Sequence, residues 1–125
     1  MLVPCEVAVK CVLPAVRAMI TRELMMKHKL KQVETAKLLG VSQPAISLYF
    51  RERRGKAIDL ENESDIALLI EDLATLLAKG NSSPEDFISA FCEICTTIRK
   101  KGLMCKLHKV FDPTIDIEKC GICLL

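Results

Sequence analysis

Five cysteines in the last third of the chain have the spacing of a metal or redox site. They include two C-x-x-C pairs, and the full set is Cys92, Cys95, Cys105, Cys120 and Cys123. Thiolates bind soft and borderline metals, and four of them can enclose a tetrahedral zinc ion or hold an iron–sulfur cluster. The spacing lets both sulfurs of a pair reach one centre, and Gly121 suits a tight turn in the second pair. We therefore expect zinc or an iron–sulfur cluster here.

Other interpretations of these cysteines stay open. The first pair also continues an apolar helical stripe and could be buried core; the stripe is Ile88, Phe91, Cys92, Cys95 and Ile98. The thiols could instead form disulfides or act in redox chemistry, although disulfides are rare in the cytoplasm. His108 follows Cys105 with the spacing C-x-x-H, so it could replace a cysteine as a ligand. The sequence does not decide which four residues would bind the metal.

A short basic run in the first half of the chain has a charge density suited to a polyanion. The run contains Arg51, Arg53, Arg54 and Lys56. A DNA duplex carries closely spaced phosphates, so such a cluster can clamp its backbone. Residues 1–56 carry eleven Lys and Arg against four Asp and Glu, whereas residues 57–125 carry seven against twelve. This asymmetry indicates that the first half binds a polyanion; the alternative is that the basic residues only solvate helix faces.

Two short helical patterns joined by a glycine turn precede the basic run. The first predicts a helix from Gln32 to Leu39, with Val33, Ala36 and Leu39 on one face. Gly40 can adopt the positive φ that ends such a helix. Ser42 is a good N-cap for a second helix from about Gln43 to Phe50. Pro44 is tolerated in its first turn, where its missing N–H would have no intrahelical partner.

This stretch resembles the helix-turn-helix of the lambda-repressor-like (Xre) family of transcriptional regulators. The matching residues are Gln32, Ala36, Gly40, Val41, Ser42, Gln43, Ile46 and Tyr49. Thr35 departs from the family, which usually has an aliphatic residue there, although its methyl group can pack. The Pro-Cys-Glu near the start, the Leu-Pro-Ala-x-Arg that follows and the cysteine-rich tail resemble a group of archaeal regulators over nearly the whole chain.

The resemblance implies a sequence-specific regulator that binds double-stranded DNA as a homodimer. It implies that the second helix lies in the major groove, with Gln43 on an adenine edge and Leu48 on a thymine methyl. Gln32 is expected to contact phosphate and to brace Gln43. The implied contacts are Gln32, Ser42, Gln43, Pro44, Ser47, Leu48, Arg51, Arg53, Arg54 and Lys56. The competing interpretation is a metal- or redox-handling interaction module that does not bind DNA specifically.

The remaining patterns predict an all-α fold in two parts. We expect a helix-turn-helix domain over 1–58 and a helical, cysteine-rich module for dimerisation and metal or redox chemistry over 59–125. The acidic run from Asp59 to Asp65 marks the boundary. The first thirteen residues are expected to form a helix or an irregular arm, with Cys5 and Cys11 in the core. A supporting helix is expected from Ala15 to about Lys29, with Pro14 suited to its first turn. Two further helices, Asp65–Ala78 capped by Ser64 and Pro84 to about Lys101, precede a tail with at most one short strand.

Composition excludes several classes of protein. Half of the residues are apolar, which is enough for a core, but the most apolar N-terminal run is interrupted by Glu6, Lys10 and Arg17. We see neither a membrane span nor a signal-peptide pattern, and Cys123 stands third from the end rather than fourth, as prenylation needs. We therefore expect a cytoplasmic protein. Without an acid–base pair, nucleophile elbow or phosphate loop, we expect neither an enzyme nor a nucleotide cofactor.

Overall fold

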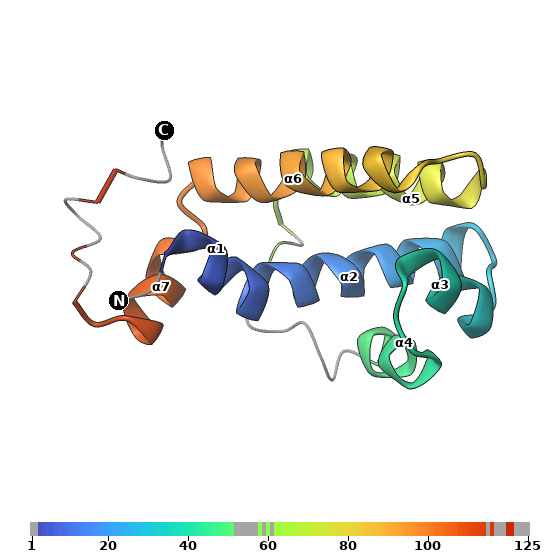
Figure 1. Cartoon of the computed structure of the whole chain (residues 1–125), viewed down its shortest axis with the longest axis horizontal. Helices are drawn as coiled ribbons and strands as arrows, with labels where there is room; N and C mark the ends of the chain where they lie inside the picture. The colour runs from blue at the N-terminus through green and yellow to red at the C-terminus, as the bar shows by residue number, and fades with distance from the viewer. Residues whose placement is uncertain are drawn as a thin grey trace.

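The computed structural model describes residues 3–51, 58, 60, 62–114, 116 and 120–121. All regular structure among these residues is helical, so the prediction of an all-α fold is confirmed (Figure 1). The elements are α1 (Pro4–Val7), the π-helical turn η1 (Ala8–Val12), α2 (Leu13–Arg22), the π-helical turn η2 (Glu23–Lys27), α3 (Gln32–Leu39), α4 (Gln43–Phe50), α5 (Ser64–Ala78), α6 (Pro84–Lys100) and α7 (Cys105–Phe111).

The first four elements follow one another without a break and form one helical rod from Pro4 to Lys27. Pro14 lies in the first turn of α2, as predicted, but the helical rod continues on both sides of it rather than beginning there. A proline ring clashes with the carbonyl group four residues earlier in a regular α-helix. Immediately before Pro14, the Leu13 N–H bonds to the oxygen of Ala8, five residues back. This wider turn accommodates the proline without breaking the helix.

The N-terminal residues place the two early cysteines differently. Cys11 is 1% exposed and belongs to the core, as expected, whereas Cys5 is exposed, so the expectation for Cys5 was wrong. The buried residues of this part of the rod are Val7, Ala8, Cys11, Val12 and Ala15. Burial raises the pKa of the Cys11 thiol above its ordinary value of 9.0, and the charge of Lys10 opposes that effect. Cys11 is thus an unreactive packing residue.

The centre of the fold is α2, which contacts α4 on one side and α5 on the other, while α6 pairs with α5 (Figure 1). Val16, Ile20 and Leu24 are fully buried along the rod. One core cluster extends from Val7 to Met104 and includes residues of both proposed domains. The two parts of the chain therefore pack against each other, and their division at residue 58 stays a prediction.

The helices α5 and α6 form an antiparallel pair with well-defined ends. The Ser83 hydroxyl accepts a hydrogen bond from the Asp86 N–H at 3.1 Å, and the Asp86 carboxylate accepts one from the Ser83 N–H at 3.0 Å. This capping box confirms the predicted start at Pro84. Ser64 is the first residue of α5 rather than its cap, so the predicted boundary was one residue late.

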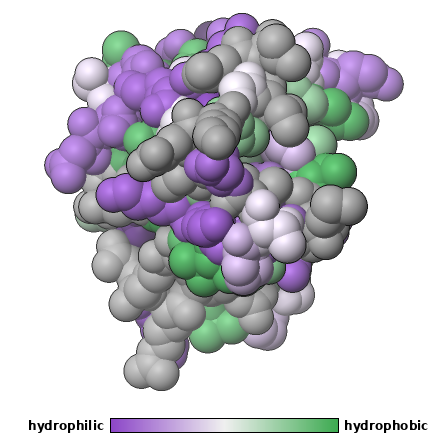
Figure 2. All heavy atoms as spheres, turned by 90° about the vertical axis from the view of Figure 1, so that its left-hand side faces the viewer, coloured by the Kyte–Doolittle hydropathy of each residue, from purple (hydrophilic) through white to green (hydrophobic). Residues whose placement is uncertain are grey.

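The tail contains a helix that the sequence analysis did not predict. Instead of a strand or irregular structure, the tail forms α7, which packs against α1, so the described part of the chain has three helices after α4 rather than the expected two. His108 of α7 is 5% exposed, and Met104, immediately before the helix, is 1% exposed. Lys10 Nζ lies 5.1 Å from the centroid of the Phe111 ring. Polar and apolar side chains are interspersed at this end of the molecule (Figure 2).

Candidate nucleic-acid interface

The unit α3–turn–α4 has the helix bounds that the sequence predicts. Gly40 ends α3 in the left-handed conformation, with φ of 67°, and the Val41 N–H bonds to the Ala36 oxygen at 3.1 Å. The Ser42 hydroxyl then caps α4 by accepting a hydrogen bond from the Ala45 N–H at 3.2 Å. Because these bonds fix both sides of the turn, they also fix the direction of α4 relative to α3.

The inner face of α4 attaches the unit to α2, and α3 packs against α4 and η2. Ile46 is fully buried and Tyr49 is 4% exposed, so their predicted inward orientation is confirmed. In α3 the expected inner face was partly wrong, because Val33 is 49% exposed and Thr35 is fully buried. The Thr35 hydroxyl donates to the Lys31 oxygen at 3.0 Å, and this bond satisfies the buried polar group.

The outer face of α4 carries the predicted base-reading residues. Gln43 and Pro44 are exposed, while Ser47 and Leu48 are half-buried. At 100° per residue, these four side chains lie on one arc of the helix, opposite Ile46. Arg51, directly after the last helical residue, is exposed and continues this arc. The structure thus brings together five of the ten predicted DNA contacts on one surface.

A hydrogen bond joins the first residues of the two helices. Gln43 Nε2 donates to Gln32 Oε1 at 3.3 Å, which is the bracing interaction that the resemblance implies. Gln43 has a second N–H and a carbonyl oxygen, and these are the two groups needed for the adenine edge. The bond restricts the Gln43 side chain before any ligand arrives, which lowers the entropic cost of ordering it on a base.

Sequence reasoning missed three further residues on this surface. Phe50 is 38% exposed at the end of α4, and its spacing from Gln43 and Ser47 could have revealed it. Lys29 and Lys31 are exposed just before α3, and the basic run before Gln32 was their signal. From residue 29 to 51 only Glu34 is acidic. The predicted contacts Arg53, Arg54 and Lys56 lie outside the described residues.

No three of the cysteines come together in the described part of the chain. Cys92 is exposed, so the alternative that Cys92 is a buried core residue is wrong. Cys95, Cys105 and Cys120 are half-buried. No group of three or more His, Cys, Asp or Glu among the described residues could hold a metal ion. The described residues therefore do not form a preassembled metal site. Cys123 lies outside them, and the zinc or iron–sulfur site stays a prediction.

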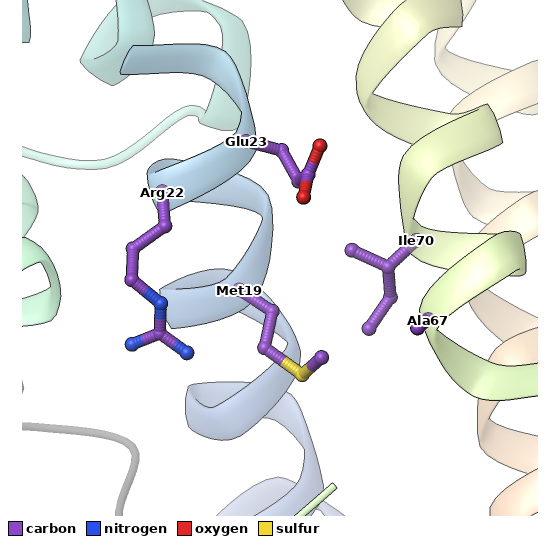
Figure 3. Close-up of a pocket in the computed structure, with 5 residues that line it drawn as sticks. All are labelled: Met19, Arg22, Glu23, Ala67 and Ile70. Atoms are coloured by element: carbon purple, nitrogen blue, oxygen red, sulfur yellow. The ribbon is translucent and has the colours of Figure 1, made fainter. Parts of the chain in front are cut away.

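A small cavity of about 180 Å³ lies where α2 and η2 meet α5 (Figure 3). It is lined by Met19, Arg22, Glu23, Ala67 and Ile70. The Glu23 side chain points toward α5, whereas that of Arg22 points away from it (Figure 3). The Glu23 carboxylate pairs with Lys27 Nζ at 3.1 Å, which also pairs with Glu71 at 3.2 Å. We assign this cavity no ligand, because the carboxylate that points into it already has a cationic partner.

Comparison with known proteins does not identify a family for this chain. None of the helices in the described ranges is both long and apolar enough to cross a membrane. None of the protein-family models, curated proteins or solved structures compared with the chain matches it significantly.

Proposed function

We propose that this chain is a sequence-specific transcriptional regulator that acts in the cytoplasm and binds double-stranded DNA as a homodimer. The observation that carries the proposal is the outer face of α4. It presents Gln43, already braced by Gln32, beside Ser47 and Leu48, on a unit whose inner face is fixed to α2. The lambda-repressor-like resemblance supports the same assignment.

The proposed docking places α4 in the major groove. Gln43 reads an adenine edge, and Leu48 contacts a thymine methyl. Arg51 binds phosphate at one end of the helix, together with the basic residues that follow it. Lys31 and Gln32, at the start of α3, face the backbone on the other side of the groove. The surface from residue 29 to 51 is basic, which favours approach to a polyanion.

Selection from a random-sequence DNA library, followed by titration of the selected site, tests this proposal. Gln43→Ala should reduce discrimination against a changed base by roughly 1–3 kcal/mol, because a bidentate contact is lost. Arg51→Ala should instead weaken binding to all DNA about equally and reduce the salt dependence. Asn81→Ala, an exposed amide in the turn between α5 and α6, is the matched control and should change neither. Failure of the wild-type protein to enrich any sequence would overturn the proposal.

The competing proposal is a metal- or redox-handling interaction module. The observation that favours it is the exposure of Cys92 one helical turn from half-buried Cys95 on α6. Anaerobic purification with metal analysis and a visible spectrum tests it. A brown protein that absorbs at roughly 400 nm would contain a cluster, and a colourless one with stoichiometric zinc would contain a structural site. A metal-free protein that binds DNA would contradict this alternative.

A further inference from the structure

A groove of about 320 Å³ lies where the turn between α3 and α4 meets the turn between α5 and α6. Helix α3 and the α5–α6 turn lie at the same end of the molecule (Figure 1). The apolar part of the lining comes from α3, α5 and α6 and consists of Leu38, Leu39, Leu77 and Phe87. This volume is at the lower end of the range for small-molecule sites. The groove can therefore hold a small ligand with an apolar body.

One cation and one hydroxyl group of this lining have no partner in the described part of the chain. Among the described residues that line the groove, Lys37 is the only ionisable one. Lys37 is exposed, and its ammonium group makes no ion pair with another described residue. The hydroxyl of half-buried Ser82 likewise makes no hydrogen bond there, whereas the Ser83 hydroxyl caps α6. The groove thus offers an anion a charge and a donor beside an apolar wall.

The charge of Lys37 is not neutralised by the nearby acids of α3 and α6. Glu34 accepts a hydrogen bond from the Lys31 N–H at 3.3 Å, and Asp86 accepts one from the Ser83 N–H at 3.0 Å. Neither acid lines the groove. The charge beside the apolar wall therefore favours a negatively charged ligand.

A second groove of similar volume has the opposite charge. It lies between α5 and α6, has a volume of about 330 Å³, and contains Asp72 and Glu93 but no cation among its described lining residues. An anion is repelled from this groove and attracted to the one beside Lys37. The sign of the charge on a ligand therefore distinguishes the two grooves.

We propose that the groove beside Lys37 is a binding site for a small carboxylate with an apolar body. The apolar body lies against Leu38, Leu77 and Phe87, while the carboxylate pairs with Lys37 and accepts a hydrogen bond from Ser82. The lining defines this occupant, because an apolar wall disfavours a purely polar anion and a single cation matches one negative charge. The site itself does not depend on DNA binding.

The position of the site also predicts a regulatory effect, and this consequence rests on the proposed function. Gly40 lines the groove and ends α3 at the turn that fixes the direction of α4. A carboxylate bound there contacts this turn, so the carboxylate and DNA should change each other's affinity by the same factor. Because Leu77 and Phe87 line the same groove, the second part of the chain would supply half of the ligand site.

Isothermal titration calorimetry of octanoate with the full chain, without DNA, tests the site. We expect about one molecule per chain and a Kd of roughly 10 μM–1 mM, as for a ligand of this size. 1-Octanol, which has no charge, should bind at least about fivefold more weakly. Butanoate should bind at least about tenfold more weakly, because it buries fewer methylene groups. No binding at millimolar octanoate, or equal affinity for the acid and the alcohol, would overturn the proposal.

Two lysine substitutions test where the carboxylate binds. Lys37→Gln should raise the Kd for octanoate at least about fivefold, because the charge pair is lost. Lys79→Gln is the matched control: Lys79 is exposed at the end of α5 but does not line the groove, so its substitution should leave the Kd unchanged. Equal effects of the two substitutions would contradict the assignment of Lys37.

Two serine substitutions test the groove itself. Ser82→Phe should raise the Kd at least about tenfold, because the ring fills the space and the hydroxyl is lost. Ser89→Phe, at an exposed position of α6 outside the groove, is the control and should leave the Kd unchanged. Circular dichroism checks that both variants are folded. A folded Ser82→Phe protein that binds octanoate like the wild type would overturn the location.

Amide chemical shifts of the wild-type protein locate the ligand without any substitution. Octanoate should shift the resonances of Gly40 and Gly80, which both line the groove. Gly102, which also has a positive φ but lies after α6 and outside the groove, should be unaffected. Shifts confined to the second groove, for example at Ala90, would overturn the proposal.

Titration of the selected DNA site with and without saturating octanoate tests the regulatory effect. The DNA affinity of the wild-type protein should change at least about threefold, whereas Lys37→Gln at the same octanoate concentration should show a smaller change. If octanoate binds and the DNA affinity is unchanged, only the regulatory effect is refuted. If octanoate binds a protein that selects no DNA, only the proposed function is refuted.

Discussion

Thr35 shows how a single residue can depart from the pattern of a resembling family and still fit the fold. Its side chain is fully buried in α3, where an aliphatic residue was expected. Its hydroxyl donates to the Lys31 oxygen at 3.0 Å, so no buried polar group is left without a partner. That same oxygen also accepts the Thr35 N–H at 3.0 Å, so the hydroxyl bond supplements the backbone bond. The methyl group should therefore matter more than the hydroxyl.

Two near-isosteric substitutions test this ranking. Thr35→Val keeps the methyl and replaces the hydroxyl, and it should change the free energy of unfolding by less than about 1 kcal/mol, because the Lys31 oxygen keeps its backbone donor. Thr35→Ser keeps the hydroxyl and removes a buried methyl, and it should cost about 1 kcal/mol. Urea unfolding of both variants measures the difference. A larger loss for Thr35→Val than for Thr35→Ser would show that the hydroxyl dominates.

Single residues of the α3–turn–α4 unit were predictable where one local interaction decides their role. The Gln32–Gln43 bond and the Ser42 cap depend on residues at most eleven positions apart. The exposure of Val33 was not predictable in the same way. Two helical stripes fit the sequence of α3 equally well: one contains Val33, Ala36 and Leu39, and the other contains Thr35, Ala36 and Leu39. Only the packing of α3 against its neighbours decides which of the two stripes is buried.

At the scale of elements, Gly40 sets the direction of the proposed reading helix. It adopts φ of 67° between α3 and α4, and Gly80 adopts φ of 75° after α5. A Cβ added at either glycine would meet no atom within 4 Å. An alanine at either position would therefore be unfavourable only because of its backbone conformation. The two glycines form a matched pair: both line one groove, but only Gly40 lies in the turn between α3 and α4.

Gly40→Ala and Gly80→Ala should each lower the free energy of unfolding by about 1–2 kcal/mol, the cost of a left-handed non-glycine residue. Only Gly40→Ala should also weaken DNA binding severalfold, since it disturbs the relation between α3 and α4. Chemical denaturation and titration of the selected DNA site provide the two measurements. If both variants lose DNA affinity equally, the effect is a general loss of stability and the assignment of the turn is wrong.

The ends of α5 and α6 are joined by Lys101. Its Nζ lies 2.6 Å from a Glu63 carboxylate oxygen and 2.7 Å from Asp65 Oδ1. The hydrogen bond with Lys101 holds the pKa of Asp65 below its ordinary value of 3.8. Bonds with Asp65 and then Glu63 raise the pKa of Lys101 above 10.5. The pair therefore contributes a pH-dependent part of the stability.

The sign of this dependence follows from the lowered pKa of Asp65. Its contribution is fully present above about pH 3.8 and is lost as pH falls through the lower folded-state pKa. Asp65→Asn should cause a small decrease in Tm at pH 7, and the difference from wild type should shrink in acid. Asp72→Asn, which removes another exposed carboxylate from α5, is the control. A difference between Asp65→Asn and wild type that is constant from pH 7 to pH 2 would contradict this account.

At the scale of the whole molecule, the helices were more predictable than their assembly. Capping and glycine signals placed α3, α4 and α6 because these signals are local. The unbroken rod through Pro14 was missed because a π-helical turn has no sequence signature, and α7 was missed because its cysteine indicated a metal ligand rather than a helix. The packing of α2 against α5 joins residues far apart in the sequence, so no local pattern indicates that both proposed domains share a core.

A shared core predicts that the two parts of the chain unfold together. Tyr49 is the only tyrosine and the chain has no tryptophan, so near-ultraviolet absorption of Tyr49 reports on α4, while hydrogen exchange of α5 and α6 reports on the second part. The two unfolding transitions should coincide.

Ile70→Ala, in α5 and 1% exposed, should destabilise both parts of the chain by about 2–5 kcal/mol, because the lost side chain faces α2. Leu68→Ala, 60% exposed on the same helix, should change both by less than about 0.5 kcal/mol. Separate transitions, or an Ile70→Ala effect confined to α5 and α6, would establish the division at residue 58 as a true domain boundary.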